Sequence, residues 1–178
     1  MNKVLKFSLL CWLLPGLLQP ALALELFGVN LEATSRDELR DAAKRAGVIL
    51  IREGSADIWF DAYDSSAVLA GSSQLYLGFV KADLRFAFAE YEFKGIHLKR
   101  LLRDLEGKYG KAITRRGSFI SDNSYSWKSD GIEISLSSNW HNYRTRLVYI
   151  DPANMADLVA ERAKAGKGVA AKPAYSVY

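Results

Sequence analysis

The sequence is poor in the residues that most often hold metals or form covalent crosslinks. Of its 178 residues, only Cys11 is a cysteine and only His97 and His141 are histidines. A structural zinc site needs four ligands, usually cysteine or histidine, and a disulfide framework needs pairs of cysteines. We therefore expect no metal, no cofactor and no disulfide, so that a hydrophobic core must hold the fold together.

The sequence also lacks a concentrated charge of either sign. It has 24 basic and 20 acidic residues, and from residue 24 to residue 151 the basic ones are spread along the chain. A nucleic-acid-binding protein is expected to carry a basic patch or stripe. This distribution therefore argues against a nucleic-acid partner.

Motifs of common hydrolases are missing as well. Gly71, Ser72 and Ser73 lack the second glycine of a G-x-S-x-G nucleophile elbow. Glu90 and Glu92 form a pair of carboxylates, but two residues apart on one strand they are expected on the solvent-exposed side of a half-buried sheet. We predict no catalytic residue from these patterns.

The N-terminus has the pattern of a secretory signal peptide. A short basic start precedes an apolar run over residues 7–18, and Ala21-Leu22-Ala23 supplies a small-x-small cleavage site. The run is too short to span a bilayer, and Leu10 before Cys11 does not fit a lipoprotein site. We predict that residues 1–23 are removed after Ala23, leaving a periplasmic or secreted chain with no transmembrane anchor.

The remaining residues predict an α+β domain over 24–164, followed by a flexible tail at 166–178. Ser35 and Glu38 form a capping box for a first helix, which Gly47 ends, and a β-branched run at 48–51 then predicts a buried strand. Leucines at helical spacing predict a second helix that ends at Gly110. A third helix is predicted at 152–165.

Short strands separated by turn residues follow each of the first two helices. Strands this close together pair as antiparallel hairpins, because a parallel crossover needs a dozen or more residues. We expect a meander of seven or eight strands with three helices covering one face, and suspect an internal repeat of 28–93 and 95–150. The order resembles that of the secreted β-lactamase inhibitor proteins and of small outer-membrane assembly lipoproteins. That resemblance is topological and carries no transferable motif.

Aromatic residues supply the candidate binding surface. Alternation along the predicted strands places four of them on the face opposite Leu75 and Leu77, and a polar aromatic turn lies in the second half of the chain. Exposed aromatic side chains among charged ones are typical of protein interfaces. The predicted binding residues are Trp59, Asp61, Tyr63, Tyr76, Tyr91, Trp140, His141 and Tyr143.

These patterns together favour a non-enzymatic binding module of the bacterial cell envelope. Its partner would be a protein, which it could bind as an inhibitor does, or another envelope component. Two other functions stay open at this point. One is a small periplasmic hydrolase that uses His141, and the other is a carrier with a small-ligand pocket between sheet and helices.

The predicted export is testable by mass spectrometry of the intact protein recovered from outside the cytoplasm. We expect a chain that begins at Leu24, and we expect Ala23→Arg to block processing because the cleavage site requires small residues. A recovered chain that still carries residues 1–23 would contradict the prediction.

Overall fold

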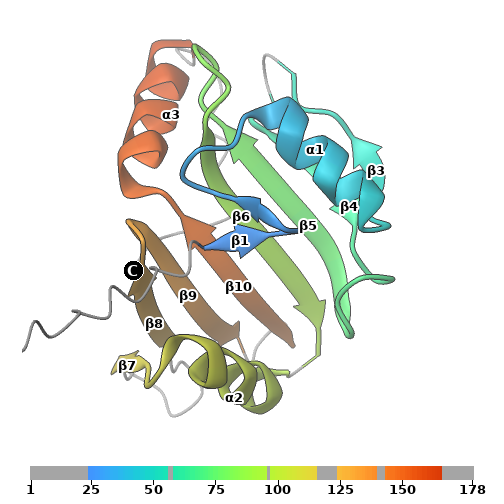
Figure 1. Cartoon of the computed structure of the whole chain (residues 1–178), viewed down its shortest axis with the longest axis vertical. Helices are drawn as coiled ribbons and strands as arrows, with labels where there is room; N and C mark the ends of the chain where they lie inside the picture. The colour runs from blue at the N-terminus through green and yellow to red at the C-terminus, as the bar shows by residue number, and fades with distance from the viewer. Residues whose placement is uncertain (1–23, 56–57, 96, 116–123, 140–142, 166–178) are drawn as a thin grey trace, which may run out of the picture.

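The computed structural model of the protein describes residues 24–55, 58–95, 97–115, 124–139 and 143–165 (Figure 1). Within these ranges lie three helices, a two-stranded hairpin and an eight-stranded sheet. The helices are α1 (Arg36–Arg45), α2 (Leu98–Tyr109) and α3 (Pro152–Ala165). None of these helices is both long and apolar enough to cross a membrane. The predicted signal peptide and tail lie outside the described residues.

All strand pairs are antiparallel, as the short connections predicted. The hairpin consists of β1 (Glu25–Leu26) and β2 (Val29–Asn30). The first half of the large sheet consists of β3 (Ile49–Arg52), β4 (Phe60–Asp64), β5 (Ser72–Phe79) and β6 (Phe86–Lys94). The second half consists of β7 (Ile113–Arg115), β8 (Ser124–Ser129), β9 (Ile132–Asn139) and β10 (Arg144–Ile150).

The strand order is β3-β4-β5-β6-β10-β9-β8-β7. Each half is thus a helix followed by a four-stranded meander, and the halves join where β6 pairs with β10. The predicted α+β class with an antiparallel sheet is confirmed. The internal repeat stays a prediction, because a shared order of elements does not establish it.

Local sequence signals fix α1 as predicted. The Ser35 hydroxyl accepts a hydrogen bond from the Glu38 amide at 3.3 Å, which satisfies one of the free N–H groups of the first turn. Gly47 follows the helix with a φ of +96°, a conformation that glycine adopts without steric cost. Leu39 and Ala43 are fully buried and attach the helix to the core.

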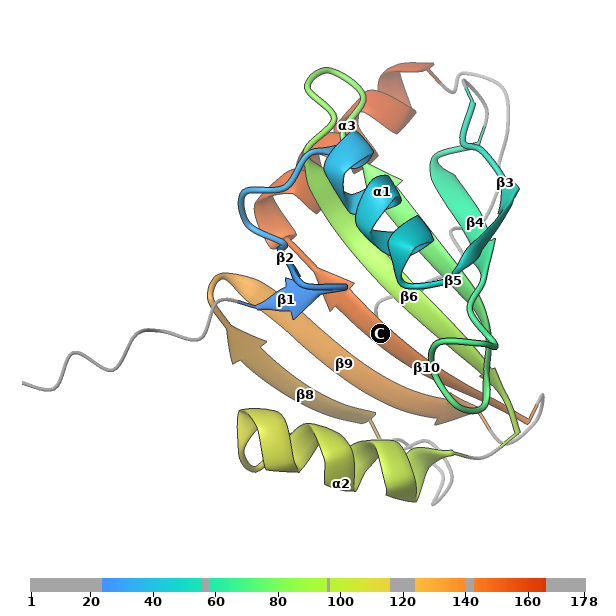
Figure 2. The same cartoon turned by 45° about the vertical axis from the view of Figure 1, so that its right-hand side comes forward.

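The helices cover both faces of the sheet, so the expectation that all three cover one face is wrong. Leucines of α1 and α2, with the hairpin, pack in the larger core on one face, whereas Leu158 of α3 packs with Val80 and Phe88 in a separate cluster. Figure 2 shows α1 in front of β5 and β6, and α3 behind them. The cause is β6, whose residues 86–89 are apolar at every position and therefore offer both faces for burial.

Glu90 and Glu92 are buried, although the sequence places them on a solvent-exposed face. They lie on a central strand, and Arg146 and Arg144 of β10 reach their carboxylates at 3.3 and 2.7 Å. Burial raises the pKa of Glu90 to about 7; Arg146 opposes this shift and the Glu92 charge adds to it. Among the described residues, the Glu90 Oε1 atom has no hydrogen-bond partner. Glu90 is therefore a destabilised anion inside the fold.

The raised pKa predicts that the protein loses stability as the pH rises. The folded chain keeps the proton of Glu90 up to about pH 7, whereas the unfolded chain loses it near the ordinary value of 4.5. The free energy of unfolding should therefore fall by about 3 kcal/mol between these pH values and then level off. Glu90→Gln should remove this fall in urea denaturation at pH 5 and pH 8. The exposed Glu133→Gln should keep it, and identical pH slopes in the two variants would contradict the assignment.

Candidate functional site

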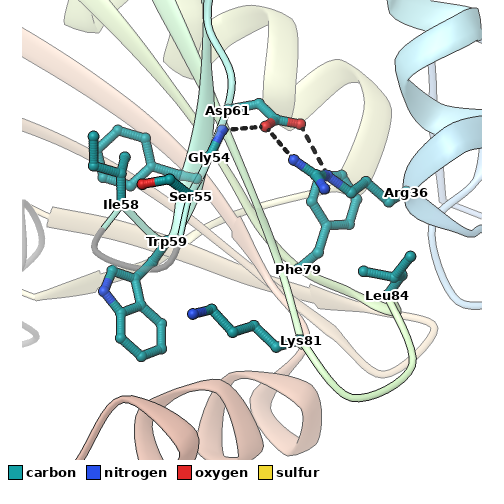
Figure 3. Close-up of a pocket in the computed structure, with 10 residues that line it drawn as sticks. Arg36, Gly54, Ser55, Ile58, Trp59, Asp61, Phe79, Lys81 and Leu84 are labelled. Atoms are coloured by element: carbon teal, nitrogen blue, oxygen red, sulfur yellow. Dashed lines mark hydrogen bonds and ion pairs between the residues drawn. The ribbon is translucent and has the colours of Figure 1, made fainter. Parts of the chain in front are cut away.

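A buried carboxylate organises the region between α1 and the first edge of the sheet. The Asp61 side chain on β4 has no solvent exposure and lies on the core face of the sheet. It accepts a hydrogen bond from the Gly54 amide at 2.7 Å and pairs with Arg36 at 2.8 Å and Arg40 at 3.1 Å. Figure 3 shows Arg36 and Gly54 directed at this carboxylate. A buried charge is tolerated when it is paired and hydrogen-bonded in this way.

The Asp61 contacts tie three segments together. Both arginines come from α1 and also reach Glu53, which follows β3. Gly54 lies in the connection between β3 and β4. One carboxylate thus fixes the helix relative to both strands.

Tyr63 extends this network towards α1. Its hydroxyl lies 3.5 Å from the Asp61 carboxylate, and its ring is buried. Burial, with the neighbouring Asp61 charge, raises the pKa of the Tyr63 phenol to about 12, while the arginines act in the opposite direction. Tyr63 therefore stays neutral and presents its ring beside the helix.

An open groove of about 740 Å³ lies between α1 and β3. One wall is a helical stripe of alternating charge, at spacings of three and four residues that place its members on one side of α1. The stripe consists of Asp37, Arg40, Asp41 and Lys44. The floor is mainly apolar and consists of Val48, Ile49, Leu50 and Tyr63.

Strand β3, beside this groove, is an exposed apolar edge. Ile49, Leu50 and Ile51 are 66, 46 and 56% exposed, so the prediction of a buried strand at 48–51 holds only for Val48. In the described part of the chain β3 pairs on one side only, with β4. A register irregularity lies between Leu50 and Arg52, whereas Ile49 and Leu50 pair regularly with β4. A β-branched run predicts a strand but does not distinguish a central position from an edge.

The second cavity near Asp61 is small. It encloses about 70 Å³ next to Trp59, which is room for a few water molecules. The Trp59 ring already contacts two cations of the same chain, with Lys81 Nζ at 4.9 Å and Arg162 Cζ at 5.5 Å from its centre. Of these two sites, the groove along β3 has more room for a ligand or partner.

The predicted placement of two aromatic residues on the face opposite Leu75 is wrong. Tyr63 and Tyr91 are in the core, and both pair in register with Leu75, on the face they were expected to avoid. The alternation along β4 correctly keeps Asp61 and Tyr63 on one face, but the register with β5 turns that face inwards, because Asp61 pairs with Leu77 and Tyr63 with Leu75.

The remaining predicted residues are scattered. Tyr76 is half-buried on the opposite face against Phe60, with ring centres 5.1 Å apart, and Tyr143 is exposed at the far end of the sheet. Trp140 and His141 lie outside the described residues. Among the described members of the predicted set, Tyr63 lines the groove between α1 and β3, and Asp61 holds α1 beside it. The charge stripe on α1 is visible in the sequence as Asp37, Arg40, Asp41 and Lys44 at spacings of three and four residues, but the aromatic pattern does not point to it.

Comparison with known proteins adds little to this geometry. No protein-family model matches the chain, and no curated protein matches it. A solved structure of a DUF4309 family protein (YjgB) from Bacillus subtilis is similar, with 14% sequence identity and a TM-score of 0.42. The match covers 67% of this chain and 81% of that one. A likeness of this degree carries no functional information.

The role of Asp61 predicts a large effect of a nearly isosteric change. Asp61→Asn removes the charge that faces two arginines whose side chains are only 21 and 22% exposed. Because those cations keep some solvent, we expect a loss near the lower end of the range for broken buried pairs, about 3 kcal/mol in urea denaturation. The exposed Asp104→Asn on α2 is the matched control. A loss below about 1 kcal/mol for Asp61→Asn would refute the role given to this carboxylate.

Proposed function

We propose that the mature chain is an exported, non-enzymatic binding module of the bacterial cell envelope, and that it binds an extended protein segment along β3. The single observation that supports this most strongly is the run of three exposed apolar side chains on β3, next to an open groove. Export rests on the N-terminal pattern that ends at Ala23.

The β3 edge has the properties of a strand-addition site. An edge strand presents unpaired N–H and C=O groups, and proteins usually protect such edges with charged residues, proline, β-bulges or a covering segment. In β3 the only charged residue, Arg52, and the register irregularity between Leu50 and Arg52 both lie in the second half of the strand, so Ile49 and Leu50 precede them. An added strand would hydrogen-bond to the backbone of β3 and shield Ile49 and Ile51 from water.

The groove supplies a place for side chains of the bound segment. Alternate residues of an added strand point to the same face, so every second one would enter the space beside Leu50 and Tyr63. Backbone pairing gives affinity in this mode of recognition, and such pockets give selectivity. The charged wall of α1 would then select among apolar segments by their flanking charges.

The proposal is tested by photocrosslinking in the native envelope, with benzoylphenylalanine in place of Leu50 and, as a matched control, in place of Val159 on α3. Val159 is equally apolar and 50% exposed. We expect adducts from position 50 that mass spectrometry maps to one extended apolar segment, and their loss when Ile49→Lys and Ile51→Lys are added. An absence of adducts at position 50, or equal adducts at position 159, would rule the proposed function out.

A further inference from the structure

The apolar part of β3 is symmetric about its middle residue. Leu50 is flanked by two isoleucines, Ile49 and Ile51, and all three are exposed. When two copies of β3 pair antiparallel around Leu50, Ile49 of one copy lies opposite Ile51 of the other. Directly opposed apolar side chains stabilise a strand pair. The apolar sequence of this edge is therefore complementary to itself, with Ile51 lying at the register irregularity between Leu50 and Arg52.

The charged wall of the groove is complementary to itself in the same sense. A two-fold axis perpendicular to the sheet would place both α1 helices on one face, antiparallel to each other. Read in opposite directions, Asp37 then faces Lys44 of the second copy, and Arg40 faces Asp41. Every position of the stripe meets the opposite charge, which favours this pairing over others.

The two features share one axis. Glu53 at the end of β3 contacts Arg36 and Arg40 in the first half of α1, whereas Lys44 lines the groove together with Val48 before the strand. The helix and strand therefore run side by side in opposite directions, with Arg40 in the middle of the stripe reaching Glu53 beyond Leu50. A two-fold axis through the paired β3 strands would place the two charged stripes on opposite sides of the joined grooves.

The stripe also has charges available for such contacts. Asp37, Asp41 and Lys44 are exposed, and within the described residues none of them forms an ion pair. Arg40 is already paired with Glu53 and Asp61. An ion pair between Asp37 of one copy and Lys44 of the other therefore distinguishes this two-fold dimer from a non-specific apolar contact.

We infer that the segment bound at β3 is the β3 strand of a second copy of this chain, so that two eight-stranded sheets join into one. This inference rests on the proposed function and names its partner. Pairing of β3 with the other exposed edge, β7, would be head-to-tail and would continue into filaments. It would also leave the charged stripes unmatched.

A charge-swap cycle on the purified exported protein tests the inference. Sedimentation equilibrium should show a dimer, and Asp37→Lys or Lys44→Asp alone should weaken it by about tenfold or more, because each change creates two like-charge contacts. The double variant, Asp37→Lys with Lys44→Asp, should restore dimerisation to within a few-fold. Asp104→Lys on α2 should leave it unchanged. Urea denaturation of each variant shows whether α1 still folds, since Asp37 lies in its acidic first turn.

The outcomes separate this inference from the proposed function. A chain that is monomeric at all concentrations, or a dimer that ignores the swaps and also survives Leu50→Lys, overturns the second copy as partner. If position 50 still crosslinks to an extended segment of another protein, the proposed function stands without the dimer. If it crosslinks to nothing, both are wrong.

Discussion

The arrangement of this protein around its first edge depends on one buried carboxylate. Asp61 has no contact with solvent and is held by Arg36, Arg40 and the Gly54 amide. These contacts fix α1 over β4 while keeping the charged side of the helix apart from β3. The groove between α1 and β3 thus follows from the pairing of Arg36 and Arg40 with Asp61. An apolar residue at position 61 would let α1 settle elsewhere on the sheet.

The two faces of the sheet are buried by different elements and to different extents. The face under α1, α2 and the hairpin holds the larger core, and α3 closes part of the other face. Burial on both sides makes β6 and β10 the stable centre, and the strands at the ends of the order are the least covered. Stability and the proposed recognition therefore reside in different strands. Because the apolar side chains of β3 are exposed, this strand contributes little to the core.

Sequence reasoning succeeded where the signal was local. Capping at Ser35 and helical spacing of leucines predicted the helices, and short turns predicted the antiparallel pairing. It failed where the answer depends on neighbours far along the chain. Residues 48–51 read the same in a central strand as at an edge, and residues 86–89 are apolar on both faces. Tyr63 changes face with a one-residue shift in the register of β4 against β5. The Asp61 network joins segments up to 25 residues apart, and no spacing rule predicts such a contact.

In the proposed assembly, another strand pairs with the outer edge of β3. Amide hydrogen exchange of residues 49–52 in the exported protein, measured from low to high protein concentration, tests this directly. We expect these amides to become protected as the protein concentration rises, while those of β7 do not change. Exchange in β3 that is equally fast at every concentration would contradict it.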